Sequence, residues 1–151
     1  MDSIDYRILK ILQKNARETA SNISKEIHLS ISAVTERIKK MEESGVIKAY
    51  TIVVDERKVG FAMTSLMEVR LNNPRSYDGF VKAVEEMDEI ISCYYKTGEF
   101  DLLLKIGCDS GDNLADIHRR IMEIDGVLDT KTDIIVKNVK NSYSAIKKPD
   151  R

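Results

Sequence analysis

Apolar residues in the first third of the chain recur every three or four positions, which is the spacing of a helix that buries one side. Three stretches show this spacing in succession, with apolar positions at Ile4, Ile8, Ile11 and Leu12, at Ala20, Ile23 and Ile27, and at Val34, Ile38 and Met41. Polar segments separate the stretches, and Gly45 follows the third as a residue type that commonly ends a helix. The pattern predicts three short helices that share one small core.

Residues 46–60, VIKAYTIVVDERKVG, are rich in β-branched and aromatic side chains. Such residues favour extended backbone, and Asp55-Glu56 is a turn signal among them. Either a short hairpin or an extended linker that leads to Gly60 fits this stretch. The expected domains are therefore a helical domain at residues 1–50, a linker or hairpin at 51–60 and a second domain at 61–151.

After Gly60 the pattern changes to alternating strand and helix signals. Asn73 and Pro74 suit the N-cap and the first position of a helix, and Gly98 suits a tight hairpin turn. In chain order, the stretches are a strand at 63–71, a helix at 72–89, strands at 90–97 and 100–108, a helix at 112–125 and a strand at 127–140. This β-α-β-β-α-β order is the ferredoxin-like arrangement, so the predicted fold class is α+β.

In a ferredoxin-like fold the two helices cover only one face of the sheet. The residues that alternate toward one side of the third strand are Phe100, Leu102, Leu104 and Ile106. Leu103 points to the other side, as Ile135 and Val139 are expected to do in the fourth strand. A sheet that is apolar on both faces, with helices for one, predicts association through the other face. We therefore expect at least a homodimer.

The composition agrees with a packed protein, because 42% of the 151 residues are hydrophobic and the charges of both signs leave a net charge of −1. Residues 1–60 have 11 Lys+Arg against 9 Asp+Glu, whereas residues 61–151 have 13 against 16, so the first part is slightly basic. No apolar run approaches the roughly 18 residues that span a bilayer, and the N-terminus has no signal-peptide pattern. A cytoplasmic protein without a membrane partner is expected.

Cys93 and Cys108 are the only cysteines, and they stand in apolar, strand-like runs without a CxxC spacing. Two reduced, buried thiols are the expected state, rather than a disulfide or a metal site. The chain also has no nucleophile elbow, no cluster of metal ligands and no glycine-rich phosphate loop. We therefore expect no metal and no cofactor.

The second and third predicted helices are separated by a short turn, as in a helix-turn-helix whose second helix enters the DNA major groove. Ser30 suits the N-cap of that helix and leaves the Ser32 hydroxyl free, where backbone N–H groups attract phosphate. Arg37, Lys39 and Lys40 suit phosphate contacts better than base contacts. The candidate DNA-binding residues are Ser30, Ser32, Ala33, Thr35, Glu36, Arg37, Lys39 and Lys40. The alternative is an amphipathic helix whose polar side is only solvated.

His28 lies in the turn between these two helices. A turn this short commonly needs a positive φ, which glycine adopts most easily and histidine adopts more often than most other residues. We interpret His28 as a turn residue that stands in for glycine, not as a ligand or a catalytic base. We interpret His118, in the second domain, as structural in the same way.

A second candidate site is the predicted hairpin turn in YYKTGEFDLLLK, residues 94–105. Glu99 and Asp101 flank it, but no nearby histidine or nucleophile completes an acid/base site. The turn is either an ordinary polar tip or a site for a small zwitterion, with backbone N–H groups at residues 97–99 on a carboxylate and Glu99 or Asp101 on an ammonium group. Thr130 and Thr132, two apart on one side of the last strand, could line the same pocket.

Four stretches in this order and spacing resemble the Lrp/AsnC, or feast/famine, family of transcription regulators. They are IDYRILKILQKNAR at residues 4–17, LSISAVTERIKKMEESGVIKAYTIVVD at 29–55, YYKTGEFDLLLKI at 94–106 and IDGVLDTKTDIIV at 124–136. The resemblance covers essentially the whole chain. It implies an N-terminal winged helix-turn-helix domain, a linker, and a C-terminal ferredoxin-like domain of the RAM type that dimerises and often assembles into tetramers, octamers or larger rings.

The resemblance also implies an amino-acid effector, because members of this family typically bind an amino acid between dimers and so alter assembly or DNA affinity. Carried over by position, the recognition helix is Ile31 to Glu43, and the effector-binding residues are Thr97, Gly98, Glu99, Asp101, Thr130 and Thr132. The chain departs from the family at His28, which replaces the usual glycine before the recognition helix. The effector loop alone does not identify the amino acid.

The expected protein is therefore a sequence-specific regulator of transcription and not an enzyme. Two symmetry-related recognition helices are expected to read a pseudo-palindromic operator in double-stranded DNA. One alternative is a regulator of the same fold without a small-molecule effector. The other is a tetrapyrrole decarboxylase of the kind that looks like this family, but such chemistry is expected to use histidines around one pocket, and the two histidines here lie in different halves of the chain.

Overall fold

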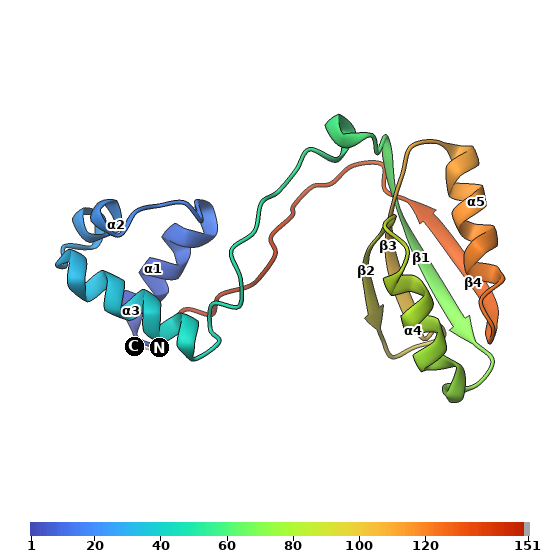
Figure 1. Ribbon diagram of the computed structural model, residues 1–151, viewed down its shortest axis with the longest axis horizontal. Helices are drawn as coiled ribbons and strands as arrows, with labels where there is room; N and C mark the ends of the chain where they lie inside the picture. The colour runs from blue at the N-terminus through green and yellow to red at the C-terminus, as the bar shows by residue number, and fades with distance from the viewer. Residues whose placement is uncertain (150–151) are drawn as a thin grey trace. The chain divides into compact units, whose positions relative to one another are not determined.

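The computed structural model describes residues 1–149, and these form two compact units (Figure 1). The first unit contains Met1–Val53 together with the segment that begins at Lys140, and the second unit contains Val54–Val139. Each unit has a hydrophobic core of its own. The second unit is therefore an insertion in the chain of the first.

The segment from Lys140 onward differs from the sequence expectation, which assigned residues 61–151 to one domain. In the structure this segment belongs to the first unit. The side-chain amide of Gln13 donates a hydrogen bond to the Ser144 carbonyl oxygen, with 2.6 Å between the nitrogen and the oxygen. The segment is polar and mostly exposed, so it has no apolar periodicity from which its return could be predicted.

The first unit contains the three helices that the apolar spacing predicted. They are α1 at Ser3–Lys14, α2 at Ala20–Ile27 and α3 at Ile31–Glu43. Before each helix stands a residue whose side chain accepts hydrogen bonds from the first turn, namely Asp2, Thr19 and Ser30. These caps satisfy N–H groups that no carbonyl within the helix can reach. The centre of the core is formed by one fully buried residue from each helix: Ile8, Ile23 and Val34.

Residues 48–55 connect α3 to the second unit without regular secondary structure. A short 3-10 helix, η1, follows at Glu56–Val59. The Asp55 side chain caps η1 by accepting a hydrogen bond from the Arg57 backbone nitrogen at 3.2 Å, and Gly60 ends it with a φ of 107°. The turn signal at Asp55 thus begins a helical turn, and no hairpin forms over residues 51–60.

The second unit has the predicted βαββαβ order, and its four strands form one antiparallel sheet in the order β2-β3-β1-β4. The strands are β1 at Met63–Leu71, β2 at Ile90–Tyr95, β3 at Leu102–Cys108 and β4 at Val127–Ile134, and the helices are α4 at Tyr77–Glu85 and α5 at Gly111–Met122. Both helices lie on one face of the sheet (Figure 1). Residues from both layers form the core, chiefly Met67, Val69, Leu102, Leu104, Ile106, Phe80, Val84, Ile117 and Ile121.

The turn that precedes α4 confirms the helix start predicted at Asn73 and Pro74. The Asn73 side-chain oxygen accepts a hydrogen bond from the Arg75 backbone nitrogen at 2.9 Å. Pro74 is the first residue of a 3-10 turn, η2 at Pro74–Ser76, which continues directly into α4. Proline suits this position because a backbone N–H at the start of a helix has no acceptor within the helix, so nothing is lost when proline lacks it.

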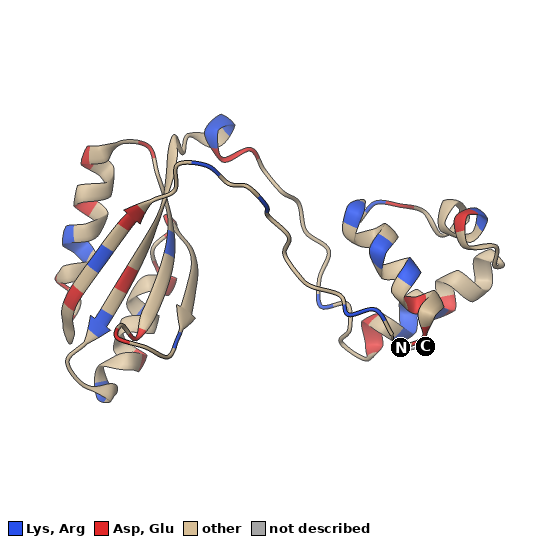
Figure 2. Ribbon diagram, turned by 180° about the vertical axis from the view of Figure 1, so that it is seen from behind, with Lys and Arg blue, Asp and Glu red and all other residues tan. Residues whose placement is uncertain are grey.

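The face of the sheet opposite α4 and α5 is called here the open face. The register places Leu103 of β3 between Glu68 of β1 and Tyr94 of β2. The neighbours of Leu103 in the chain, Leu102 and Leu104, are fully buried in the core on the other face. Charged positions recur along the strands where the sheet is seen from behind (Figure 2). Leu103 therefore lies on the open face, as predicted, among charged and aromatic side chains.

Phe100 does not follow the alternation that was expected to place it in the core with Leu102. Its side chain is buried, but it lies outside the core cluster, and the guanidinium carbon of Arg70 is 4.7 Å from the centre of its ring. Phe100 stands in the bend before β3, where the twofold alternation of a strand does not yet apply.

Strand β4 ends at Ile134, whereas the sequence predicted a strand up to residue 140. The Ile135 backbone nitrogen still donates a hydrogen bond to the Thr64 carbonyl oxygen at 2.9 Å, but β1 begins at Met63 and offers no partner further along. Val139 is 88% exposed. The prediction that Ile135 and Val139 belong to the sheet is therefore wrong.

The two cysteines are free thiols, with Cys108 fully buried and Cys93 half-buried. Burial raises the pKa of both thiols, which keeps them protonated and unreactive at neutral pH. Within residues 1–149, no three His, Cys, Asp or Glu side chains gather as a metal site. No helix in this range is long and apolar enough to cross a membrane.

His28 has a φ of 60° and a ψ of 47°, which is the left-handed helical conformation. It is the only non-glycine residue among residues 1–149 with a positive φ. Its backbone N–H donates a hydrogen bond to the Ser24 carbonyl oxygen and closes the last turn of α2. The interpretation of His28 as a substitute for glycine is confirmed.

We predict that His28→Gly leaves the fold and DNA affinity unchanged and raises the free energy of unfolding by about 0.5 kcal/mol. The gain is small because relief of the left-handed strain, about 1 kcal/mol, is partly offset by the greater freedom of glycine in the unfolded chain. Urea unfolding measures it. His28→Val is the control and should lose about 1–2 kcal/mol, since a branched Cβ tolerates this conformation poorly. A large loss in the glycine variant would show that the imidazole has another role.

Candidate nucleic-acid interface and effector loop

The N-terminus of α3 begins at Ser30, which the sequence predicted as the N-cap. The Ser30 hydroxyl oxygen accepts a hydrogen bond from the Ala33 backbone nitrogen at 3.2 Å. Its oxygen also lies 3.1 Å from the Ser32 hydroxyl oxygen, so the two hydroxyls are hydrogen-bonded to each other. The sequence had predicted a free Ser32 hydroxyl. Both serines are exposed, and short side chains of this kind allow close approach of a partner to the helix N-terminus.

The outward side of α3 is polar because its inward side is fixed by the core. Val34 and Met41 are buried, and the exposed candidate residues on the remaining surface are Thr35, Glu36, Lys39 and Lys40. The Thr35 hydroxyl donates a hydrogen bond to the Ile31 carbonyl oxygen at 2.9 Å, so its oxygen remains available only as an acceptor.

Lys40 and Glu36 form an exposed ion pair, with 2.8 Å between Nζ and Oε1. The hydrogen bond from Lys40 holds the pKa of Glu36 below its usual value. Lys39 and Glu43 form a second exposed ion pair at the same spacing along the helix, with 3.7 Å between Nζ and Oε1. Exposed pairs at this spacing contribute little to stability and break readily, so both lysines remain available for phosphate groups.

Arg37 differs from the other candidates because it is directed toward α1. Its Nη1 atom lies 2.7 Å from Oδ2 of Asp2 and 2.6 Å from Oδ1 of Asp5, and its side chain is 30% exposed. The Nη1 atom of Arg37 is thus engaged with α1, which was not expected of a residue assigned to phosphate contact. The prediction of Arg37 as a phosphate contact rested on helical spacing, which carries no signal for partners more than 30 residues away in the chain.

The predicted effector loop is a hairpin between β2 and β3. The Lys96 backbone nitrogen donates to the Asp101 carbonyl oxygen at 2.8 Å, and Gly98 has a φ of 130° that favours glycine. Asp101 is half-buried, and its Oδ2 accepts a hydrogen bond from the Leu71 backbone nitrogen at 2.8 Å. Its carboxylate attaches the hairpin to β1.

Glu99, in contrast, is an exposed carboxylate, with 77% of its side chain accessible. Arg70 Nη2 donates to its Oε1 at 2.9 Å. Arg70 was not a candidate from the sequence, although its place next to Val69 in an alternating strand implies the open face. The hairpin therefore presents an anionic and a cationic group close together.

Thr130 and Thr132 lie away from the hairpin. Their partners in β1 are Val69 and Met67, which point into the core, so both threonines are on the helix-covered side of β4. The Thr130 hydroxyl oxygen is 2.8 Å from Nε2 of His118 on α5, and the Thr132 hydroxyl is buried without a hydrogen-bond partner. A single chain therefore does not bring these threonines and Glu99 into one pocket. The contact of His118 with Thr130 joins α5 to β4, which agrees with the structural role expected for this histidine.

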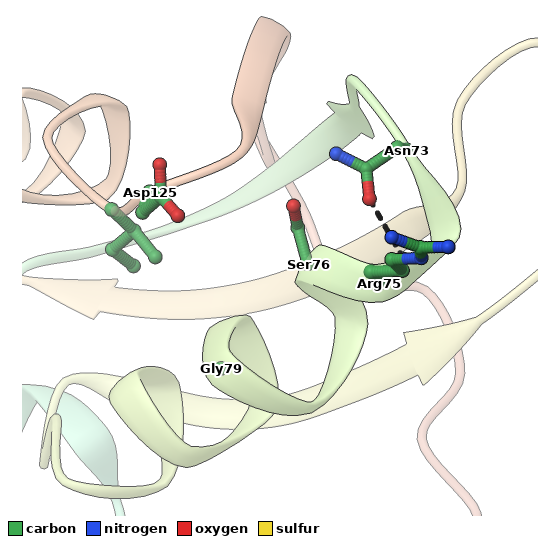
Figure 3. Close-up of a pocket in the computed structure, with 6 residues that line it drawn as sticks. Asn73, Arg75, Ser76, Gly79 and Asp125 are labelled. Carbon is green, nitrogen blue, oxygen red and sulfur yellow. Dashed lines mark hydrogen bonds between the residues drawn. The ribbon is translucent and has the colours of Figure 1, made fainter.

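Two hollows are present in the second unit, and neither contains the effector loop. One, of about 450 Å³, lies at the start of α4 (Figure 3) and is lined by Asn73, Arg75, Ser76, Gly79, Ile124 and Asp125. The other, of about 400 Å³, lies beside η1 and the ends of β1 and β4. Thr97, Gly98, Glu99 and Asp101 line neither hollow. In a single chain the loop is thus an exposed tip and not an enclosed site.

A helix-turn-helix with an exposed polar side on its second helix, joined to a ferredoxin-like unit, defines a DNA-binding regulator of transcription. The chain belongs to the Lrp/AsnC family. Residues 64–145 match the family model of the Lrp/AsnC ligand binding domain, and residues 1–48 match that of a winged helix-turn-helix DNA-binding domain.

The relatives named by comparison are regulators as well. The chain is 31% identical to the regulatory protein AsnC of Haemophilus influenzae over 91% of this chain and 93% of that protein. It is 35% identical to the transcriptional regulator LrpB of Bacillus subtilis over 95% and 94%. A crystal structure of a Neisseria meningitidis transcriptional regulator in complex with L-Met superposes with a TM-score of 0.92, at 25% identity over 97% and 96% of the two chains. The prediction of a regulator rather than an enzyme is confirmed.

We predict that Ser30→Ala and Ser30→Asp separate the two roles of this residue. Alanine removes the N-cap and should lower the free energy of unfolding by about 1 kcal/mol. Aspartate caps equally well and should keep the stability, but its charge faces the DNA phosphates and should weaken DNA binding. Urea unfolding and fluorescence anisotropy with labelled DNA measure the two effects. Full DNA affinity in Ser30→Asp would place the DNA elsewhere than at this helix end.

Proposed function

We propose that the protein binds DNA as a homodimer, or as a larger assembly of dimers, and that an amino acid at the hairpin of residues 97–101 alters its assembly or DNA affinity. Two copies of α3 would read a pseudo-palindromic operator with half-sites about one helical turn apart, which is the spacing a twofold dimer imposes. The proposed place of action is the cytoplasm. No metal or further cofactor is part of the proposal.

The open face of the sheet is the observation that carries the proposed dimer. Leu103 and Leu66 lie on it with Tyr94, whose side chain is 58% exposed. The ion pair of Lys96 and Glu68, 2.8 Å long, crosses the same face. Apolar and aromatic side chains surrounded by charged ones are the usual composition of a protein–protein interface. A second copy of the chain, related by a twofold axis, would cover the apolar residues.

The hairpin supports the proposed amino-acid effector. Backbone N–H groups near Gly98 suit a carboxylate, and the exposed Glu99 suits an ammonium group. The match to a ligand binding domain and the L-Met complex of the Neisseria regulator also support it. Because the hairpin lines neither of the two hollows described and its tip is exposed, the rest of the site would come from a neighbouring copy. Effector control would then be a shift between assembly states, limited by the difference in affinity for them.

We predict that Leu103→Arg converts the dimer to a monomer without unfolding it, because Leu103 points away from the core. Sedimentation velocity measures the mass. The affinity for a two-half-site DNA should fall by roughly a hundredfold, because two linked binding events become one. Val139→Arg adds the same charge at a residue outside the sheet and should remain dimeric. A Leu103→Arg protein that is still dimeric would rule out the open face as the interface.

We predict that at least one of the twenty amino acids raises the unfolding temperature of the protein. A ligand at 100 times its Kd adds about 2.7 kcal/mol to the free energy of unfolding, which a thermal-shift panel detects. Glu99→Gln should abolish the shift. Glu123 is an exposed carboxylate at the C-cap of α5, and its replacement in Glu123→Gln should leave the shift unchanged. A panel without any shift would favour the same regulator without an effector.

A further inference from the structure

Arg37 and two N-terminal carboxylates form a cluster that joins the first helix to the recognition helix. The guanidinium nitrogen Nη1 lies 2.7 Å from Asp2 Oδ2 and 2.6 Å from Asp5 Oδ1. Asp5 and Arg37 are largely shielded from water, with 16% and 30% of their side chains exposed. The residues involved are 32 and 35 positions apart in the chain, so this is a tertiary contact and not a local one.

The two carboxylates are themselves held in place by the start of α1. Asp2 Oδ1 accepts hydrogen bonds from the backbone nitrogens of Ile4 and Asp5, each at 2.8 Å. Asp5 Oδ2 accepts one from the Asp2 backbone nitrogen at 2.9 Å. Each carboxylate thus uses one oxygen for this capping box and the other for Arg37. Because both oxygens are fixed, the position of the guanidinium is fixed as well.

The apolar contacts of α3 do not determine its position to the same degree. Val34 and Met41 are buried against α1 and α2, but apolar burial depends on area and has little directional preference. A charge-assisted hydrogen bond is short and directional. The apolar core therefore decides which side of α3 faces outward, and the cluster adds a directional contact that can hold the helix in one rotation and position.

We propose that Arg37 is a positioning residue for DNA recognition, and that Asp2 and Asp5 hold it so that α3 presents Thr35 and Glu36, whose side chains can reach base edges, at the correct angle. Its charge serves the attachment to α1 and not a DNA phosphate. The hydrogen bonds to Asp2 and Asp5 raise the pKa of Arg37, and the hydrogen bonds from the Asp5 backbone and from Arg37 lower the pKa of Asp2. Arg37 and Asp2 thus stay charged across the neutral range.

This proposal and simple electrostatics make opposite predictions for the acidic residues. Removing two negative charges from a DNA-binding unit should strengthen its attraction to any DNA, if charge alone acts. Removing the partners of Arg37 should weaken binding to the specific sequence, if the orientation of α3 matters. The double variant Asp2→Asn/Asp5→Asn tests this, because asparagine caps a helix as well as aspartate does and keeps the capping box while it removes the charges.

The matched control is a second arginine held between two carboxylates, which belongs to the second unit and not to the DNA-binding unit. Arg119 on α5 pairs with Asp116 and Glu123 in the second unit. Asp116→Asn/Glu123→Gln makes the same change in net charge and removes both carboxylate partners of an arginine, in this case within one exposed stretch of helix. Affinities are measured by fluorescence anisotropy over a series of salt concentrations, both for the DNA that the wild-type protein selects from a random-sequence pool and for random DNA.

We expect the ratio of specific to random affinity to fall about tenfold in Asp2→Asn/Asp5→Asn, which is the size of one lost base contact. The control variant should keep the wild-type ratio. Arg37→Gln should give the same fall without a change in salt dependence, because no phosphate contact is lost. The triple variant should be no worse than Arg37→Gln alone, since all of these changes break one cluster.

The opposite results would overturn the proposal. If Arg37→Gln lowers the slope of log affinity against log salt by about 0.9, Arg37 neutralises a phosphate. An unchanged or higher ratio in Asp2→Asn/Asp5→Asn would show that the carboxylates do not position α3. Circular dichroism verifies that each variant is folded. If the double variant is unfolded, Arg37→Gln tests the positioning role by itself, because it leaves the capping box intact.

Discussion

The burial of one side of α3 is the interaction on which the DNA-binding unit depends. Val34 and Met41 can reach the core only if the residues one position away face outward, so the polar surface of the helix follows from its apolar one. The turn before α3 must then reverse the chain within a few residues. His28 makes this possible by accepting a left-handed conformation. The same packing that buries Val34 and Met41 in the small core therefore exposes the polar side of α3 that is available to DNA.

The helices and the caps of the first unit could be predicted because their signals are local. Ser30 as the N-cap and His28 at a positive φ each depend on neighbours within a few residues. Arg37 could not be assigned in this way. Helical periodicity distinguishes the inside from the outside of a helix, but Arg37 lies at the border between them, and its partners, Asp2 and Asp5, come from the other end of the unit.

The order of strands and helices in the second unit was also evident from the sequence, whereas the ends of the elements were not. The β-branched run continues past Ile134, yet a strand exists only where a neighbour pairs with it, and beyond the Ser65–Ile134 pair only Thr64 and Met63 of β1 remain. Around the hairpin, residue type suggested free carboxylates. In the structure Asp101 is committed to the backbone of β1, and only Glu99 remains exposed. Whether a carboxylate is available to bind a ligand depends on tertiary contacts, which the residue type alone does not reveal.

The return of the chain from Lys140 to the first unit affects the order in which the protein can be completed during synthesis. The three helices emerge from the ribosome first, but the Gln13–Ser144 contact forms only after the whole second unit has been made. The second unit is consequently joined to the DNA-binding unit by two stretches of backbone and not by one. A cut in the first stretch would leave the second unit attached to the three helices only through noncovalent contacts of the returning segment, such as the Gln13–Ser144 hydrogen bond, whereas a cut in the second stretch would leave the covalent link through residues 48–55 intact.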